Sequence, residues 1–422
     1  SIILLDEIQN IPIEYWNLVR EVLLGMTKYY NCRIILITAT KPLIFEESEY
    51  IELVENYEKY FKESDLNRVC LEINLSKQDI PNFYNSLINW SKSSYLFVFN
   101  TIGASLEFYY LLSRDKFEEI ETIVLNKEGK KKIKIKKIIK GDHKYDLYYL
   151  SSNIIPKVRR ERIEVIKKRI ENNQKVIIIS TQLIEAGVDI DCECVFRDIG
   201  PLDSIIQVSG RCNRNKKYKK GETHLINLIK INEKGSEYRY ANIYDKVLLN
   251  IVGELLKEKE FIFEKDFLDL INEYFSEAKG KSILETKLIK SLYSLYFYDK
   301  NSDSDKRKPI SEFKLIKERD WYKVDVFVEL NEEAQKVYRK YQEIREIKNT
   351  FERKNEFLKI RKDFYDYVIS IPYQCASDFI ENKDISYIPE IAKEDIEQGH
   401  YYDLETGFKK RADFSEGGSL IF

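Results

Sequence analysis

Two adjacent carboxylates, Asp6 and Glu7, follow the first apolar run of this 422-residue chain. In nucleotide hydrolases a strand-end pair of this kind has two tasks. The first carboxylate holds Mg²⁺, usually through water, and the second orients the attacking water. Acidic residues also cap buried strands without any catalytic role, so the pair alone is ambiguous. Thr38 and Thr40 end the next apolar run and are also compatible with a plain strand-to-loop turn.

The most informative stretch runs from Ser180 to Arg214 and reads STQLIEAGVDIDCECVFRDIGPLDSIIQVSGRCNR. The i, i+3, i+4, i+7 spacing predicts that one helical face carries Gln207, Gly210, Arg211 and Arg214. A purely structural amphipathic helix would have apolar residues there. Guanidinium groups suit the charge that spreads over a transferring phosphoryl group, so the two arginines are candidates for arginine fingers.

Two further residues of this stretch precede the predicted helix. Gly187 allows a tight turn, and Asp189 is placed to meet a ribose hydroxyl or one of the two arginines. Several spaced features thus agree within one stretch, which favours phosphoryl-transfer chemistry over a structural explanation.

Strands and helices that alternate along the first part of the chain must position these residues. Two apolar runs, SIILLDE and CRIILITAT, flank a helical pattern, and further runs such as SYLFVFNT, KVIIIST and CVFRDI continue the alternation. This rhythm predicts an α/β fold with parallel sheets. The polar signatures follow the carboxyl ends of strands, where open α/β sheets place their ligands.

The remainder of the chain has a mostly helical pattern, interrupted by the strand-like run WYKVDVFVEL. Amphipathic stretches include FLDLINEYF, a segment from Ser282 to Phe297, and two more between Glu332 and Val368. We therefore expect three parts: two α/β domains at 1–75 and 76–232, and a mostly helical domain at 233–422.

The composition excludes some classes of protein. No apolar run approaches the roughly 18 residues of a membrane span, which excludes an integral membrane protein. Lys plus Arg (69) nearly balances Asp plus Glu (71), so any polyanion must be met by a local groove. The six cysteines show no CxxC spacing, which indicates reduced thiols of an intracellular protein and no zinc site.

A lysine-rich segment, Asn126 to Lys144, interrupts the second α/β domain. Its alternation KIKIKKIIK suits a hairpin with one cationic face. A solvated ribbon and a contact with DNA phosphates are both compatible with this pattern.

The motifs together resemble a known family. LDEIQ, TAT, FVFNT, STQLIEAGVDID and QVSGRCNR occur in the order of motifs II to VI of superfamily 2 helicases. The fuller wording of the last two resembles the CRISPR-associated helicase-nuclease of type I interference systems. The likeness covers residues 1 to about 232, and more loosely the tail, through YKVDVFVEL and YYDLETGF. It implies tandem RecA-like domains, the first truncated, followed by a mostly helical C-terminal domain.

The resemblance also implies roles for individual residues. Asp6 would hold the magnesium of an ATP–Mg²⁺ complex and Glu7 would position water, while Thr38 and Thr40 would couple hydrolysis to movement. A final group would lie along a bound single strand of DNA: Asn100, Thr101, Ser180 and Thr181.

The sequence departs from the family pattern in three places. Gln9 stands where this superfamily often has His, although an amide can still hydrogen-bond across the cleft. The chain has no GxGK[ST] phosphate loop, and because Ser1 opens directly on a strand-like run we expect that segment upstream. Gly280-Lys281-Ser282 reads instead as a helix connection. The family's metal-dependent nuclease is also missing, since the three histidines (His143, His224 and His400) are scattered.

By resemblance, the complete protein would be a cytoplasmic, ATP-dependent single-stranded DNA translocase of antiviral defence. A Cascade-type surveillance complex would recruit it to an R-loop, with a nuclease fused upstream or supplied as a separate subunit. Two alternatives remain open: an RNA helicase of the same superfamily, and an ATP-independent nucleic-acid-binding module.

Overall fold

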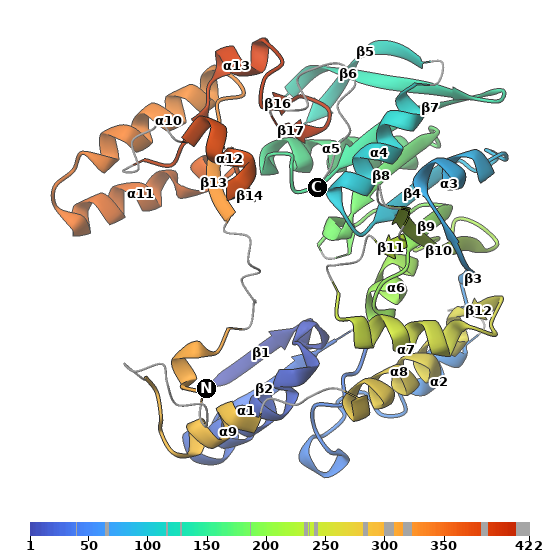
Figure 1. The fold of residues 1–422 in the computed structure, drawn as a ribbon, viewed down its shortest axis with the longest axis vertical. Helices are drawn as coiled ribbons and strands as arrows, with labels where there is room; N and C mark the ends of the chain where they lie inside the picture. The colour runs from blue at the N-terminus through green and yellow to red at the C-terminus, as the bar shows by residue number, and fades with distance from the viewer. Residues whose placement is uncertain are drawn as a thin grey trace. The chain divides into compact units, whose positions relative to one another are not determined.

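Figure 1 shows a computed structural model of the chain, which forms two compact units. The first unit comprises Ser1–Leu75, Gly200–Ser209 and Tyr244–Glu318, and the second comprises Ser76–Ile199, Gly210–Ile243 and Arg319–Phe422. The structure describes residues 1–38, 40–63, 67–114, 117–126, 129–185, 187–231, 235, 237–239, 244–281, 286–298, 308–314, 323–380 and 387–410. Across these ranges, no helix has both the length and the apolar character needed to cross a membrane.

A short βαβ element opens the first unit, as the sequence predicts. β1 (Ile2–Asp6) and β2 (Arg33–Ile37) are parallel, with Asp6 paired to Ile37, so their carboxyl ends lie together. α1 (Trp16–Tyr30) connects the two strands. The Trp16 side chain is 1% exposed, and its ring meets Phe275 of α8 (Phe267–Lys281) edge-on at 5.6 Å. This aromatic contact fixes α1 against a helix that is distant in sequence.

Further helices and a strand pair complete the first unit. Its helices include α2 (Glu58–Lys62), α6 (Leu202–Ser209), α7 (Lys246–Leu256) and α9 (Thr286–Tyr293). Gly280 and Lys281 are the last two residues of α8, consistent with the expected end of a helix. β12 (Phe261–Phe263) pairs antiparallel with residues 70–72 of β3 (Val69–Gln78). Short 3₁₀ helices lie at Ile8–Asn10, Ile13–Tyr15, Glu47–Glu49, Glu264–Asp266 and Ile310–Glu312.

A twisted sheet of mainly parallel strands forms the centre of the second unit (Figure 1). The strands on its main path that lie wholly within the second unit have the order β10-β9-β4-β8-β7-β6-β5. The first five strands of that order are parallel to one another: β4 (Ser94–Phe99), β7 (His143–Leu150), β8 (Val176–Thr181), β9 (Cys194–Asp198) and β10 (Gly221–Ile231). The fold is thus α/β with a large, parallel-rich sheet, as the alternating pattern predicts.

Continuous apolar runs place β4 and β8 at the middle of the sheet. Every residue of both strands is buried, which is the pattern of a parallel strand covered on both faces. The core around them is rich in aromatic rings, and Phe97 stacks on Phe196 of β9 at 4.9 Å. The helices of this part of the unit are α3 (Ile80–Ser86), α4 (Ile102–Ser113) and α5 (Pro156–Glu171), with a 3₁₀ turn at Gln182–Ile184.

The lysine-rich segment forms one strand instead of a hairpin of its own. β6 (Gly129–Lys140) runs antiparallel between β7 and β5 (Phe117–Asn126), a strand that the sequence pattern does not reveal. Residues 127–128 and the side chains of 119–126 and 129–135 lie outside the described set. Of the described lysines, Lys136 lies over the Phe117 ring at 4.4 Å and Lys140 over the Tyr84 ring at 4.5 Å. These two lysines contact protein.

The C-terminal part of the second unit combines a small sheet with helices. β13 (Lys323–Val328) pairs with β14 (Val368–Pro372) and β15 (Glu390–Ile391). The two helices predicted between Glu332 and Val368 are present as α10 (Glu332–Arg345) and α11 (Thr350–Tyr365). The other elements of this part are α12 (Tyr373–Ile380), α13 (Lys393–Glu397), β16 (Tyr402–Asp403) and β17 (Gly407–Phe408), whereas β11 (Glu237–Arg239) pairs antiparallel with β10 in the large sheet.

The β16–β17 hairpin attaches this C-terminal part to the loop before α5. The Tyr402 hydroxyl accepts a hydrogen bond from the Ile155 N–H at 3.1 Å, and the Phe408 N–H donates to the Asn153 carbonyl at 3.0 Å. Gly407 has φ +85° and lies so close to this loop that an added Cβ would approach the Asn153 carbonyl oxygen to 2.3 Å. Only glycine fits here without a shift of the backbone.

We therefore expect Gly407→Ala to lower the free energy of unfolding by at least about 2 kcal/mol, because it adds left-handed strain and a backbone clash. Gly399→Ala is the matched control, since Gly399 has φ +77° but no atom within 4 Å of its added Cβ. Urea denaturation of both variants measures the difference. Equal losses in the two would show that the close approach at Asn153 contributes nothing.

Candidate functional site

The carboxyl ends of β1 and β2 carry a hydrogen-bonded set of polar side chains. Glu7 has a left-handed φ of 55°, which turns the chain away from β1. Gln9 is 5% exposed, and its Nε2 donates to Glu7 Oε2 while its Oε1 accepts from the Thr38 hydroxyl. The structure thus joins Glu7, Gln9 and Thr38 in one network. The amide of Gln9 connects the two strand ends.

Asp6 and Thr40 lie next to this network in different environments. Asp6 is exposed, and its Oδ1 accepts the Glu7 N–H at 3.0 Å. Thr40 is 3% exposed, and its buried Oγ1 has no hydrogen-bond partner within the described structure. An unpaired buried hydroxyl costs about 1–3 kcal/mol, which a ligand or a local rearrangement could offset. The accessible Asp6 carboxylate fits a hydrated Mg²⁺, which prefers oxygen ligands, and the Thr40 hydroxyl could donate a hydrogen bond to a phosphate oxygen.

In the second unit, the sheet register gathers residues from distant parts of the sequence. Phe99 pairs with Thr181 and Val98 pairs with Arg197, so the carboxyl ends of β4, β8 and β9 form one edge. Asn100 follows β4 there and is 2% exposed. Its Nδ2 donates to Asp198 Oδ2 at 2.6 Å, and its Oδ1 accepts from Arg197 Nη1 at 2.5 Å.

Arg197 and Asp198 extend this contact into a buried charged network. Arg197 is fully buried, and its Nη2 forms an ion pair with Glu185 Oε1 at 3.0 Å. Asp198 Oδ1 accepts the Leu228 N–H at 3.1 Å. Burial raises the pKa of Asp198 to about 7, although Arg197 and the donated hydrogen bonds oppose the shift. The network joins β4, β9, β10 and the turn after β8.

Sequence reasoning missed the role of these charged residues. The signal was available, because Arg197 and Asp198 stand together inside the apolar run CVFRDI. Charged residues in a central strand are rarely buried unless they are paired, so their presence predicts a buried partner.

The remaining residues expected along a DNA strand have structural contacts. Ser180 is fully buried, and its hydroxyl donates to the Leu150 carbonyl at 2.9 Å. The Thr101 hydroxyl accepts the Ala104 N–H at 3.0 Å and caps α4. Thr181 is 7% exposed. The structure brings these residues to the same edge, but Asn100 and Ser180 would have to leave their present partners before their side chains could contact a ligand.

Three further predicted residues lie in loops outside the helices and strands: Gly187, Asp189 and Arg214. Gly187 has φ +71°, which matches the predicted tight turn. Asp189 pairs with Arg214 through Oδ1 and Nη1 at 3.2 Å. Asp191, which sequence reasoning did not single out, is 7% exposed and accepts the N–H groups of Arg214 and Asn215 at 2.7 and 3.1 Å. The backbone of Arg214 is therefore fixed, while its side chain pairs at the surface.

The prediction of one helical face carrying Gln207, Gly210, Arg211 and Arg214 is wrong. α6 ends at Ser209. The Cys192 N–H donates to the Arg211 carbonyl at 2.9 Å, and the Cys192 carbonyl accepts the Asn213 N–H at 2.8 Å. The Asn213 N–H therefore cannot donate to the Ser209 carbonyl of a continued helix, and Asn213 has a left-handed φ of 46°.

The two arginines and Gln207 consequently have different surroundings. Arg211 donates to the carbonyls of Ile184 (3.2 Å from Nε) and Glu185, so it anchors the turn after β8. Gln207 belongs to α6 in the first unit, and its buried Nε2 has no hydrogen-bond partner within the described structure. Gly210 directly follows the end of the helix. Like Thr40, Gln207 has an unpaired polar atom that a ligand could satisfy.

We expect Asp198→Asn to lower stability by about 1–3 kcal/mol, because it disturbs a buried hydrogen-bonded network. The folded-state pKa of about 7 lies above the usual value, so the folded state binds the extra proton between about pH 4 and 7. The stability that Asp198 contributes is fully present at low pH and is lost as the pH rises through 7.

Urea denaturation at pH 5 and pH 8 measures this effect. The difference in stability between the unsubstituted protein and Asp198→Asn should be larger at pH 5. A difference that does not change with pH would mean that Asp198 stays ionised in the folded protein.

Comparison with known proteins points to one family. A family profile described as CRISPR-associated nuclease/helicase Cas3, C-terminal, matches residues 91–217. A CRISPR-associated nuclease/helicase Cas3 from Methanothermobacter thermautotrophicus is 28% identical over 260 residues, which cover 56% of this chain and 30% of the relative. The chain thus spans less than a third of that relative's length.

Solved structures agree with this result at the level of the fold. A crystal structure of T. fusca Cas3-AMPPNP has a TM-score of 0.53 and 13% identity, and covers 92% of this chain and 49% of the other. A structure described as CRISPR RNA-guided surveillance complex, pre-nicking, has a TM-score of 0.52 and 12% identity, with 93% and 54% covered. The chain is thus similar to CRISPR-associated nuclease/helicase Cas3 proteins in sequence over part of its length, and similar to solved Cas3 structures in fold.

Proposed function

We propose that this chain is part of an ATP-dependent motor that moves along single-stranded DNA in CRISPR-based antiviral defence. One observation carries the proposal: within each unit, polar residues of the helicase motifs gather at the carboxyl ends of parallel strands. Ligands of open α/β sheets bind at this edge. We propose the same division along the sequence that the pattern predicts, with parts at residues 1–75, 76–232 and 233–422.

ATP and Mg²⁺ fit the residues of the first unit. Asp6 would hold the metal through water, and Glu7 would orient the attacking water, with Gln9 holding the Glu7 carboxylate in place. The bound metal would supply neutralisation of phosphate charge. Thr38 and Thr40 would respond to the nucleotide, because the unpaired Thr40 hydroxyl could gain a partner when it binds.

Arg214, more than Arg211, has the properties of an arginine finger. Its ion pair with Asp189 is exposed, with 41% and 66% of the two side chains accessible, and such pairs contribute only about 0–1 kcal/mol. The guanidinium can therefore exchange Asp189 for a phosphate at little cost. Arg211 instead binds two backbone carbonyls, and we assign it a positioning role for the turn after β8.

In the complete protein, Arg214→Ala should lower ATP turnover by about 10³-fold or more with a much smaller change in nucleotide affinity, because a finger acts on transition-state charge. Glu7→Gln should lower turnover similarly and retain bound ATP. Steady-state ATPase rates and nucleotide titrations measure both effects. Lys167→Ala is the control, since it removes the other described partner of Asp189, at 3.7 Å. Equal losses of binding and turnover would indicate a structural role for Arg214.

The 422-residue sequence has no GxGK[ST] loop to hold the β- and γ-phosphates. We therefore expect the chain by itself not to hydrolyse ATP, because Asp6 and Arg214 alone cannot organise the transferring group. DNA-stimulated phosphate release by the purified chain, above the level of its Arg214→Ala variant, would contradict this expectation.

The relatives support the proposed substrate and partner. One related structure is described as a CRISPR RNA-guided surveillance complex, which supports recruitment by a Cascade-type complex at an R-loop. An RNA helicase remains the second candidate from the motifs alone. ATPase stimulation by DNA against RNA of the same sequence, in the complete protein, separates the two because the 2′-hydroxyl distinguishes these strands. Binding to either strand without any ATPase would favour an ATP-independent binding module.

A further inference from the structure

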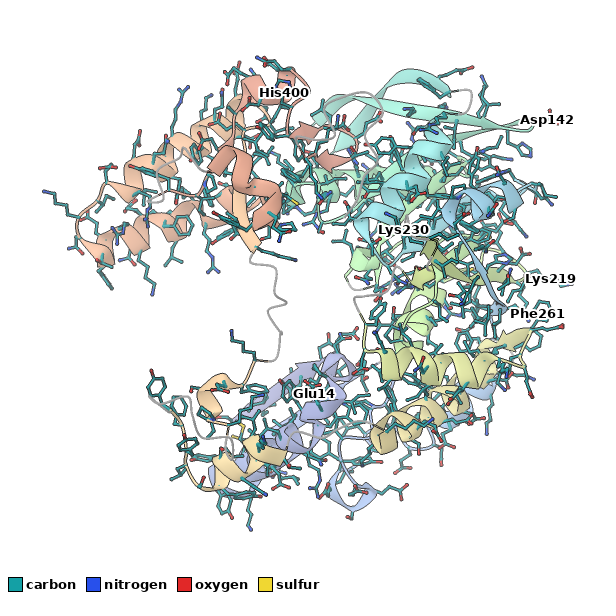
Figure 2. The ribbon with its side chains drawn as sticks, in the orientation of Figure 1. Glu14, Asp142, Lys219, Lys230, Phe261 and His400 are labelled. Atoms are coloured by element: carbon teal, nitrogen blue, oxygen red, sulfur yellow. The ribbon has the colours of Figure 1, made fainter. Side chains whose placement is uncertain are left out.

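The edge of the second-unit sheet opposite the helicase motifs carries a separate side-chain cluster. Cys194 begins β9, and its register partner Glu222 lies at the start of β10, two residues before His224. In Figure 2, the labelled Lys219 lies just before β10 and the labelled Lys230 near its far end, so the cluster lies toward Lys219. None of the phosphoryl-transfer chemistry uses this edge.

The three side chains offer ligand atoms of the types that zinc prefers. The Cys194 Sγ, a Glu222 carboxylate oxygen and an imidazole nitrogen of His224 all lie within 4.8 Å of one another. Ligand bonds of about 2.3 Å to sulfur and about 2.0 Å to nitrogen or oxygen separate tetrahedral ligands by about 3.5 Å. Side-chain movements of about 1 Å would therefore close the set around an ion.

The surroundings restrict these ligands and keep part of the site dry. Cys194 is 2% exposed and belongs to the aromatic core of the unit. The Phe196 ring stacks on His224 with centroids 4.6 Å apart, which orients the imidazole. The Cys212 thiol donates to the carbonyls of Glu193 and Glu222 at 3.3 and 3.4 Å, so the backbone on both strands is held at the cluster.

Lys92 is the competing cation at this place. Its Nζ lies 2.5 Å from Glu222 Oε1 and compensates the carboxylate charge. A carboxylate has a second oxygen, and the Glu222 side chain is 45% exposed, so Glu222 can turn from Lys92 toward an ion. Metal binding would displace the Cys194 thiol proton to solvent.

We propose that Cys194, Glu222 and His224 form a binding site for one Zn²⁺ ion, with water as the fourth ligand. Thiolate and imidazole together favour zinc over Mg²⁺ or Ca²⁺, which bind oxygen ligands. The ion would hold the starts of β9 and β10 together, next to the backbone to which Cys212 is anchored. The sequence spacing predicts no zinc site, because it contains no CxxC motif. The ligands proposed here come instead from two neighbouring strands.

Co²⁺ serves as the spectroscopic probe, in the intact protein after removal of metals with a chelator. A cobalt titration should show thiolate-to-cobalt charge transfer together with d–d bands of tetrahedral intensity, and Zn²⁺ should abolish both. Cys194→Ser should remove the charge-transfer band, and His224→Gln should weaken cobalt binding by about tenfold or more. Cys375→Ser, which changes a cysteine of the C-terminal core, is the matched control and should leave the spectrum unchanged.

The experiment overturns the proposal if the unsubstituted protein gives no thiolate charge-transfer band, or if Cys194→Ser leaves that band intact. The first result needs no variant, so a failure of Cys194→Ser to fold cannot hide it. Circular dichroism of each variant accompanies the titration. ATP turnover is not the readout, so loss of the proposed motor function would not affect the conclusion.

Discussion

The ion pair between the buried Arg197 and Glu185 is the interaction on which one edge of the second unit's sheet depends. This edge is formed by the carboxyl ends of β4, β8 and β9. The guanidinium of Arg197 also binds Asn100, which in turn binds Asp198, so three strand ends share one network. Buried charges of this kind add little net stability, but removal of one partner leaves an uncompensated charge and is strongly destabilising. The network thus specifies one arrangement of the strand ends that carry the motif residues. Asp198, with a pKa of about 7, makes this arrangement sensitive to pH near neutrality.

The arginines Arg197, Arg211 and Arg214 differ in the kind of partner that they have. Arg197 and Arg211 bind protein groups, with carboxylate and amide partners for the first and backbone carbonyls for the second. Arg214 has its backbone held by Asp191 while its side chain pairs with the exposed Asp189. In the first unit, Gln9 and Thr38 are paired, whereas the Thr40 hydroxyl has no partner among the residues that the structure describes.

The C-terminal part belongs structurally to the second unit. Its aromatic core includes Ile155, and its terminal hairpin binds the loop before α5 through Tyr402 and Phe408. Because Gly407 leaves no room for a side chain, this attachment is specified by packing as well as by hydrogen bonds. Any movement of the C-terminal part would therefore act on α5 and on the strand that follows it.

The sequence by itself determined the α/β fold, the order of the motifs and the likeness to the helicase-nuclease family, because each depends on local patterns. Continuous apolar runs predict buried parallel strands such as β4 and β8, and tight turns such as that at Gly187 follow from residue type. The end of α6 at Ser209 was decided by the tertiary structure, since Cys192 pairs with the backbone of Arg211 and Asn213 and prevents the helix from continuing. Strand register likewise decided two sets of contacts: the Arg197 network, and the cluster of Cys194, Glu222 and His224. Residues far apart in the chain become neighbours only when the sheet forms, and no local spacing records that pairing.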